Sequence, residues 1–548
     1  MGNEMVKSRT DKHLLNQLMF SLYPEPKTIY REYIQNATDS ILEAELSGIL
    51  SPNEGHITVD INENKQEIKI WDNGKGLSQN EAETILKDIS VSTKRDKVYT
   101  AGYFGIGKFV GAGYCQQMTF RTTTKDENVI SVLTFDVIKI RMILDNPSIC
   151  MSPNEVIDTC TFFSIEKKDK IADHFFEVIL SQIKPEYVNL LLSEELIKDY
   201  LVQIAPIDFK APFKTSLFFS SLEKSNEKIK NNVKALRFVK LTLKKNVDIR
   251  KDYGLKVEGT DDKIKEIRFF MIDDPKYGDL AWGWYAVTPF STQIAETNTS
   301  SLTRGLRLRI KNIQIGSESF FDGTEYFKEA RGNKFFNGEI YILNQNIKPT
   351  SDRSDIQPTT EGQLLKKKIH DFCISELGPV YRNANAAKTT IQNYEKTVQE
   401  LNKIQEKAIT TDYTKEDKEK EISIAQKKKE KIFDDLQKRV INKEGKSEGE
   451  KAVLDIYKER AKNISDSVRE HTPPFVTSAP SEDKNTKKAN EDINEKEDIF
   501  AELRSKYNDD EMKMIEKIFE IIDVNFYTDA YKRVVNPVKR KILSELNK

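Results

Sequence analysis

The stretch Arg31-Glu-Tyr-Ile-Gln-Asn-Ala-Thr-Asp39 decides how the rest of the sequence is interpreted. Its polar residues Glu32, Asn36 and Asp39 stand at positions i, i+4 and i+7, which places them on one face of a helix over two turns. The apolar residues around them would dock the helix into a core. A carboxylate can take a proton from water, and an amide oxygen can bind a hard cation such as Mg²⁺. Taken alone, the stretch fits an ordinary amphipathic helix with a polar stripe equally well.

The composition limits the class of protein. The chain has 548 residues, of which 38% are hydrophobic, and this length predicts three or four domains. With 86 basic and 87 acidic residues, net charge does not indicate a nucleic acid or a membrane as the partner, so any basic surface would be local. Four cysteines without a CxxC pair and five scattered histidines predict a reducing compartment and no zinc site. Residues 1–10 lack an apolar segment, and no run of about 18 apolar residues follows, so we expect a cytoplasmic protein without a membrane span.

A second motif follows two predicted strands. Residues 57–61 and 67–71 alternate between apolar and polar side chains, which predicts a hairpin. The second strand runs into Asp72-Asn-Gly-Lys-Gly76. A carboxylate at a strand end followed by two glycines lies where backbone can approach a flat ligand closely. A plain Asp-Asn-Gly turn is the alternative explanation.

The segment from Gly102 to Gly113 is the most glycine-dense part of the chain. Glycines before an apolar helical run predict a loop whose amides bind an anion at a helix N-terminus. The P-loop pattern GxxxxGK[ST] matches from Gly102 through Lys108 but fails at Phe109, where a hydroxyl group is needed. The dinucleotide pattern GxGxxG is also absent from this segment, so we expect a phosphate loop of a third kind.

Further elements complete a first domain that we end near residue 200. Between the two motifs the pattern predicts a helix over residues 81–89 and a polar segment over 90–95. Strands are predicted over residues 117–123, 129–136 and 158–165, and helices over 175–183 and 186–200.

The four motifs together, ExxxNxxD on a helix, DxGxG after a strand, GxFGxG before a helix and a threonine on a late strand, resemble the GHKL ATP-binding (Bergerat) fold. That superfamily includes the 90-kilodalton heat-shock chaperones, the gyrase B subunit, MutL, MORC proteins and histidine kinases. The segments EYIQNATDS and GYFGIGKF look most like the chaperone branch. The resemblance covers roughly residues 1–200 and implies an α/β sandwich that binds ATP and Mg²⁺.

The resemblance also implies roles for individual residues. Glu32 would activate the attacking water, Asn36 would bind Mg²⁺, and Asp39 would set hydrogen bonding in the site. Asp72 would accept a hydrogen bond from the adenine amino group, with Thr161 beside it. The residues expected to approach or wrap the nucleotide are Gly74, Gly76, Gly102, Phe104, Gly105, Ile106, Gly107 and Lys108.

Three positions depart from the chaperone pattern. Ser40 replaces a common alanine, and Cys160 stands where a glycine often precedes the adenine-contacting threonine. Lys108 replaces an aromatic residue, and it would either touch phosphate or face solvent. The histidine-kinase alternative fails because the chain has no His-rich phosphoacceptor helix upstream and because those kinases lack the general base that Glu32 would supply.

Residues 201–370 are predicted to form a strand-rich middle domain of the transducer type, beginning with a strand over 201–209. Trp282 and Trp284 are expected in its core. Alternation places Arg307 and Arg309 on one strand face. That face would either bind an acidic partner or lie in solvent without one.

The segment around Arg353 resembles the middle-domain loop with which the chaperone branch sends an arginine into its own ATP site. Such a guanidinium would pair with the γ-phosphate and stabilise developing charge. The alternative is a surface turn in which Arg353 pairs with Asp352 or Asp355.

Helical patterns dominate the remainder of the chain. Residues 371–470 contain two long helices, arranged as a coiled-coil hairpin or as a dimer stalk, and a further helix over 452–468. Residues 471–496 are predicted to be a flexible linker, and residues 497–548 a small helical unit for oligomerisation or docking.

The sequence therefore predicts an α+β protein, a cytoplasmic Mg²⁺-dependent ATPase of the heat-shock-chaperone-like GHKL type. We expect a homodimeric clamp that acts on a protein client, with residues 90–101 as a lid over the nucleotide. The alternatives are a nucleic-acid clamp like MutL or MORC proteins, in genome maintenance or phage defence, and a scaffold switched by ATP. The arginine strip favours the nucleic-acid clamp, and the near-neutral net charge does not.

Overall fold

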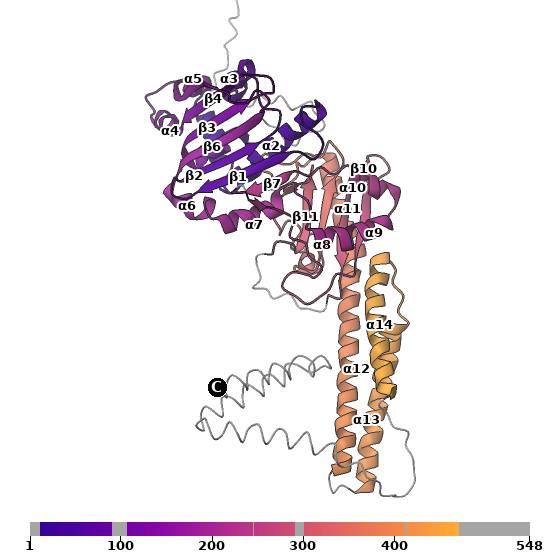
Figure 1. Ribbon diagram of the computed structural model, residues 1–548. Coiled ribbons are helices and arrows are strands. Elements are labelled where there is room, and N and C mark those ends of the chain that lie inside the picture. The colour runs from indigo at the N-terminus through magenta and orange to yellow at the C-terminus, as the bar shows by residue number, and fades with distance from the viewer. Residues whose placement is uncertain (1–10, 90–106, 245, 291–300, 411–413, 471–548) are drawn as a thin grey trace, which may run out of the picture. The chain divides into compact units, whose positions relative to one another are not determined.

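The computed structural model describes residues 11–89, 107–244, 246–290, 301–410 and 414–470, all of which belong to one compact unit spanning Met1–His471. The fold is α+β, as predicted, and its first part is built on an eight-stranded sheet with the order β5-β4-β3-β6-β2-β1-β7-β8 (Figure 1). Its strands are β1 (His56–Asn62), β2 (Glu67–Asp72), β3 (Cys115–Thr123), β4 (Val129–Asp136), β5 (Thr161–Lys167), β6 (Phe175–Ile183), β7 (Lys240–Leu243) and β8 (Val247–Asp248).

Helices bury the apolar side of this sheet. Side chains of β1 and β2 alternate between buried and partly exposed, and the buried set faces α2 (Thr28–Leu46). Gly48, just beyond α2, has a φ of +71°, the left-handed conformation that commonly ends a helix. The other helices of this part are α1 (His13–Asn16), the π-helical turn η1 (Gln17–Ser21), α3 (Gln79–Lys87), the 3₁₀ turn η2 (Gly107–Gly113), α4 (Val137–Asp145), α5 (Pro153–Cys160), α6 (Pro185–Leu191) and α7 (Glu194–Ile204).

Two sequence predictions in this part are wrong. Residues 175–183 form β6, the strand between β3 and β2, and not a helix. Val178 and Leu180 are buried while Ile179 between them is partly exposed, so the short apolar run follows the strand period, which sequence alone does not distinguish from a buried helical turn. Residues 158–165 are not one strand: α5, started by Pro153 and a Ser152–Glu155 capping box, continues to Cys160.

A second sheet of five strands has the order β12-β11-β13-β10-β9. Its strands are β9 (Glu266–Asp274), β10 (Gly278–Val287), β11 (Gly305–Ile310), β12 (Ile313–Ile315) and β13 (Asn337–Ile342). Trp282 and Trp284 are buried on β10, as predicted. The predicted strand over 201–209 is wrong, because α7 continues to Ile204. The helical segments here are α8 (Ala211–Phe213), η3 (Lys214–Phe218), α9 (Phe219–Glu223), α10 (Glu227–Lys234), the 3₁₀ turn η4 (Gly332–Phe335), α11 (Thr360–Phe372) and η5 (Cys373–Leu377).

Long helices follow the second sheet. Figure 1 shows α12 (Gly378–Thr410), α13 (Lys415–Leu436) and α14 (Glu448–Glu470) running side by side, with the turn η6 (Gln437–Ile441) at the end of α13. The ring centroids of Tyr394 on α12 and Phe433 on α13 are 5.7 Å apart, so the first two helices pair within one chain. The predicted helix over 452–468 is confirmed in α14. A coiled coil and a dimer stalk stay predictions, and the predicted linker and C-terminal unit lie outside the described residues.

Candidate functional site

Helix α2 carries the polar face that the sequence predicted. Glu32 and Asp39 are buried, with 5% and 2% of their surface exposed, and Asn36 between them is half-buried. Tyr30, Ile34 and Ala37 on the same helix are fully packed in the core. The helix therefore presents a carboxylate, an amide and a second carboxylate at the border of the packed interior.

Arg353 reaches this helix from the segment after β13. Its Nε donates to Oε1 of Glu32 at 3.0 Å, and its side chain is 3% exposed. Beside it, Nη2 of Arg31 donates to the Asp352 carbonyl at 2.5 Å. Two consecutive residues of α2 thus hold two consecutive residues of the Arg353 segment.

The contacts of the described residues contradict the alternative in which Arg353 lies in a surface turn and pairs with Asp352 or Asp355. The Asp355 carboxylate pairs with Lys366 at 2.5 Å, and the Asp352 carboxylate accepts from Thr350 and from the Ser354 amide. Arg353 itself has a φ of +57°, a left-handed conformation that costs a residue with a Cβ about 1 kcal/mol or more. The tightly bonded turn around it maintains that conformation and directs its side chain to Glu32.

The glycine segment meets Glu32 from another side. A Cβ on Gly107 would lie 2.5 Å from Oε2 of Glu32, so no larger residue fits there without displacing the carboxylate. Gly102, Phe104, Gly105, Ile106 and the proposed lid over 90–101 lie outside the described residues. Of the predicted phosphate loop, the structure therefore describes only the last part, which lies beside α2.

Lys108 does not face solvent freely, and its expected contact with phosphate stays a prediction. Its ammonium group donates to the Ile85 carbonyl in α3 and lies 5.1 Å from the Phe109 ring centroid. Burial lowers the pKa of Lys108 to about 8. The group is thus not free in solvent, and it would have to leave the Ile85 carbonyl to touch phosphate.

Asp72 ends β2 inside the molecule. Its Oδ1 accepts from the Gly74 amide at 2.8 Å, and a Cβ on Gly74 would lie 2.6 Å from that oxygen and would also clash with Ser40 of α2. Gly76 has a φ of +70°, and a Cβ there would run into the Thr123 carbonyl. Both glycines are therefore required by close packing around Asp72.

The structure does not bring Thr161 to Asp72, and that prediction is wrong. Thr161 starts β5 at the edge of the sheet, and three strands, β4, β3 and β6, lie between β5 and β2. Neighbouring strands lie about 4.8 Å apart, which puts Thr161 far from the carboxylate. Phe176 of β6 is the residue paired with Asp72, and Phe176 in turn pairs with Thr122 of β3, whose hydroxyl accepts from the Leu77 amide at 2.8 Å.

Sequence reasoning missed three residues around this site. A ring nitrogen of His174 lies 2.7 Å from the Gly74 carbonyl, and Tyr33 hydrogen-bonds the turn η2. Lys311 lines the same cavity as Asp39, at the tip of the hairpin formed by β11 and β12. None of the three is a defined position of the four sequence motifs, and each lies near the site because of a neighbour that is distant in sequence.

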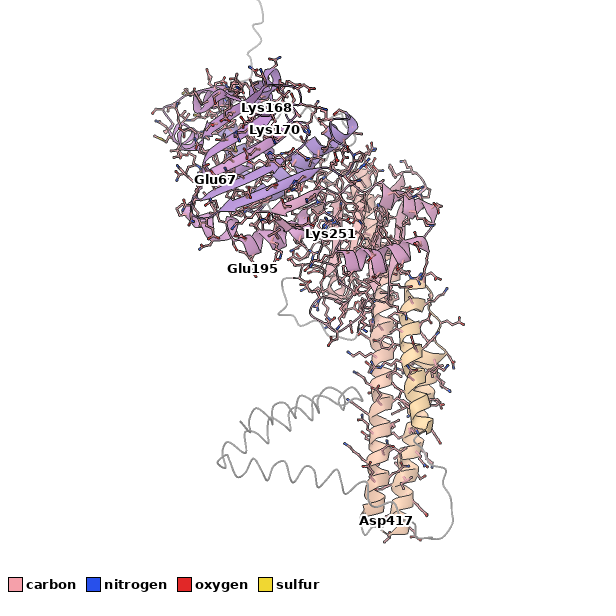
Figure 2. All side chains as sticks on the ribbon, viewed as in Figure 1. Glu67, Lys168, Lys170, Glu195, Lys251 and Asp417 are labelled. Carbon is pink, nitrogen blue, oxygen red and sulfur yellow. The ribbon has the colours of Figure 1, made fainter. Side chains whose placement is uncertain are left out.

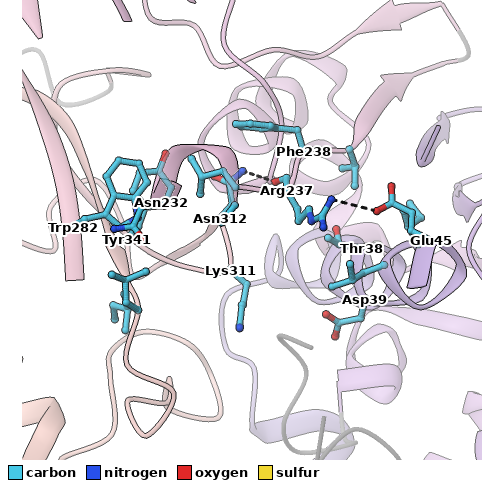
Figure 3. Close-up of a pocket in the computed structure, with 17 residues that line it drawn as sticks. Thr38, Asp39, Glu45, Asn232, Arg237, Phe238, Trp282, Lys311, Asn312 and Tyr341 are labelled. Carbon is cyan, nitrogen blue, oxygen red and sulfur yellow. Dashed lines mark hydrogen bonds and ion pairs between the residues drawn. The ribbon is translucent and has the colours of Figure 1, made fainter. Parts of the chain in front are cut away.

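Figure 3 shows the cavity between α2 and the second sheet, with a volume of about 220 Å³. Thr38 and Asp39 line it from α2, and Lys311 reaches it from the hairpin. Burial lowers the pKa of Lys311, and the Asp39 carboxylate opposes this shift. The polar face of α2 therefore continues beyond Glu32 to a cavity that Lys311 of the second sheet also lines.

The strip of arginines on β11, Arg307 and Arg309, is not exposed on the surface of the protein. Arg307 and Arg309 are each 1% exposed, so both the acidic-partner and the solvated-face expectations are wrong. Arg309 Nε donates to Oε1 of Glu339 at 2.7 Å, and Lys251, labelled in Figure 2, lies 2.8 Å from Oε2 of the same carboxylate. The strip is the core of a buried ion network.

The same arginines hold the end of α7. Nη1 of Arg307 donates to the Gln203 side chain at 3.0 Å, and Nη2 of Arg309 donates to the Gln203 carbonyl at 2.8 Å. The end of α7 is therefore fastened to the second sheet by buried, charged hydrogen bonds, which are stronger than neutral ones.

Residues 25–166 match the family of histidine kinase-, DNA gyrase B- and HSP90-like ATPases. The N-terminal part of the chain is therefore similar to the GHKL superfamily, in keeping with its sheet, its polar helix and its glycine positions. The chaperone protein HtpG of Wigglesworthia glossinidia brevipalpis is 30% identical to the chain over a match that covers 18% of the chain and 18% of HtpG. Of the helices in the described part of the chain, none combines the length and apolar composition that a membrane crossing requires.

Proposed function

We propose that the chain binds ATP with Mg²⁺ and hydrolyses the ATP, using a site built from α2, the Asp72 segment and the glycine segment. The observation that carries this proposal is the contact of Arg353 with Glu32. A general base and a cation from separate parts of the chain meet at the position where an attacking water and a γ-phosphate need them. The match of residues 25–166 to a family of ATPases supports the same conclusion.

The described residues fit the nucleotide and its metal ion. Gly74 and Gly107 bring the backbone close to Asp72 and Glu32, at positions where a Cβ would clash with Ser40 or with the Glu32 carboxylate. The half-exposed amide of Asn36 offers an oxygen to a hard cation. Within the described ranges no group of three or more His, Cys, Asp or Glu residues could hold a metal ion, so Asn36 would share the ion with the phosphates. Bound Mg²⁺ would neutralise phosphate charge.

Within this proposal each residue has one task. Glu32 takes the proton of the attacking water, and its Oε1 is oriented by Arg353. The guanidinium of Arg353 stabilises the charge that develops on the transferred phosphoryl group. Asp72 binds the adenine amino group, and Lys108 bonds the α3 carbonyl or, after release, a phosphate oxygen. Because the Arg353 segment follows β13, hydrolysis depends on the packing of α2 against the second part of the chain.

For the biological task we propose a cytoplasmic homodimer that works as an ATP-driven clamp on a protein client. The nucleic-acid clamp loses its main support, because the arginines that favoured it are buried. The deciding experiment measures ATP turnover with and without DNA, together with the mass of the particle with a non-hydrolysable ATP analogue. We expect turnover that does not respond to DNA and a doubling of mass with the analogue. DNA-stimulated, strongly salt-dependent turnover would select the nucleic-acid clamp, and unchanged mass with slow turnover would favour the ATP-switched scaffold.

A further inference from the structure

Tyr33, the neighbour of Glu32 in sequence, connects α2 to the turn η2. Its hydroxyl group donates to the Lys108 carbonyl at 3.1 Å and accepts from the Gly111 amide at 3.0 Å. The side chain is 2% exposed, and the Met118 sulfur lies 3.5 Å from the hydroxyl. One buried hydroxyl thus bonds both ends of a tight turn.

The turn is shaped around this hydroxyl group. A Cβ on Gly111 would lie 2.6 Å from the Tyr33 oxygen and would overlap Leu180 of β6. Phe109, Val110 and Ala112 of the turn are buried, so η2 has no freedom to shift outward. The position of η2 relative to α2 is therefore set by the hydroxyl group and by the packing around it.

A hydroxyl group buried in this way needs hydrogen-bond partners that replace its lost contacts with water. Burial raises the pKa of Tyr33 well above its ordinary value. A buried hydroxyl without partners costs free energy, whereas an apolar side chain would fill the same space without that risk. With both partners satisfied, the hydroxyl supplies directional positioning that apolar packing does not provide.

We propose that Tyr33 is a positioning residue for the phosphate end of the nucleotide site. The turn η2 begins at Gly107, the residue that contacts Glu32, so Tyr33 places the end of the glycine segment next to the general base. This inference rests on the proposed function. According to the inference, Tyr33 supports the binding of the phosphates. It does not affect the binding of the adenine base, which depends on Asp72.

Tyr30 provides a matched control on the same helix. Its hydroxyl group is also buried and donates to the Leu191 carbonyl at 2.6 Å, in α6 and away from η2. Tyr33→Phe and Tyr30→Phe each remove one buried hydroxyl from α2 and keep the ring. The two variants therefore share the general cost of the change and differ in which element loses its contact.

The test measures the affinity of the full chain for ATP, ADP and adenosine by calorimetry, with thermal unfolding of each variant. For Tyr33→Phe, which loses both hydrogen bonds to η2, we expect ATP and ADP to bind about 5- to 10-fold more weakly, with adenosine binding unchanged. For Tyr30→Phe we expect unchanged binding of all three ligands. Equal affinity in Tyr33→Phe and the wild type, or a loss that includes adenosine, would overturn the inference. A wild-type chain that binds no ATP would instead refute the proposed function.

Discussion

Nε of Arg353 lies 3.0 Å from Oε1 of Glu32, although 321 positions separate the two residues along the chain. The contact joins α2 to a segment that follows the last strand of the second sheet. It forms because the Arg353 turn is held in a left-handed conformation and because Arg31 binds the adjacent carbonyl. Both the proposed chemistry and its dependence on the second part of the chain follow from this pair.

Replacing Glu32 by alanine should abolish ATP turnover and leave ATP binding in place. The variant lacks the group that accepts the proton of the attacking water, whereas Asp72 and the glycine positions are unchanged. Turnover assays and calorimetry on the same preparation check this prediction. Glu45→Ala, a change at the far end of α2, is the control and should keep full turnover. Normal hydrolysis by Glu32→Ala would remove Glu32 from its role as general base.

Replacing Arg353 should lower turnover by a factor of about 10 or more, since arginines that act on transferring phosphoryl groups contribute factors of about 10³ to 10⁵. Two variants separate the side chain from the backbone, whose φ is +57°. Arg353→Gly relieves the left-handed conformation, and Arg353→Ala retains its cost of about 1 kcal/mol. We therefore expect equal loss of turnover in both variants and a higher melting temperature for the glycine variant. Unchanged turnover in either would exclude Arg353 from the mechanism.

Asp72→Asn should abolish ATP binding with little effect on folding. The asparagine oxygen can still accept from the Gly74 amide, which now lies 2.8 Å from Oδ1, so the turn is preserved. An adenine amino group, however, would face an amide in place of a carboxylate. Calorimetric titration with ATP and with adenosine measures the effect, and both affinities should fall together. Retention of adenosine binding would place the base elsewhere.

The buried Glu339 should make stability depend on acid pH. Burial raises the pKa of its carboxyl group, but Arg309 and Lys251 outweigh this and hold the pKa at about 2, below the ordinary value of 4.5. Because the folded-state pKa is depressed, Glu339 contributes stability that is fully present above pH 4.5 and is lost as the pH falls towards 2. Denaturant unfolding of the wild-type chain across this window should show the loss.

Glu339→Gln tests the same network at neutral pH. It leaves Arg309 and Lys251 buried without their carboxylate, which typically costs about 3 to 5 kcal/mol of unfolding free energy. Glu166→Gln is the control, since Glu166 is half-exposed and pairs with Arg121 at 2.7 Å, and such surface pairs are worth about 1 kcal/mol or less. If the two substitutions lowered the unfolding free energy equally, the assignment of a buried ion network around Glu339 would be contradicted.

Local patterns in the sequence predicted the first half of the candidate site well. The spacing of Glu32, Asn36 and Asp39 predicted α2, and alternation predicted the hairpin of β1 and β2 that ends at Asp72. In each case the information lies within a few residues of the feature. The expected partner of Asp72 failed for the opposite reason. The order of the strands in the sheet decides which strand lies beside β2. The short apolar run of β6 does not show from sequence alone whether it is a strand or a helical turn.

Sequence patterns could not predict the contacts between distant parts of the chain. Alternation placed Arg307 and Arg309 on one face correctly, but it could not show that Glu339, Lys251 and Gln203 cover that face. A charged strand with buried counter-ions has the same pattern as a charged strand in water. The neighbourhood of Arg353 and Glu32 was expected only because of a family resemblance, since no spacing rule relates residues 321 positions apart.

The pairing of β7 with β1 has a practical consequence for dissecting the protein. Residues 240–243 add a parallel strand to the sheet of the first 200 residues, with Leu241 opposite Ile57 and Leu243 opposite Val59. A recombinant fragment that stops at residue 200 would therefore expose the backbone edge of β1, and unpaired edges promote aggregation. Cloning the part of the chain that forms the first sheet would call for a terminus beyond residue 248, or for a chimaera that supplies the missing strand.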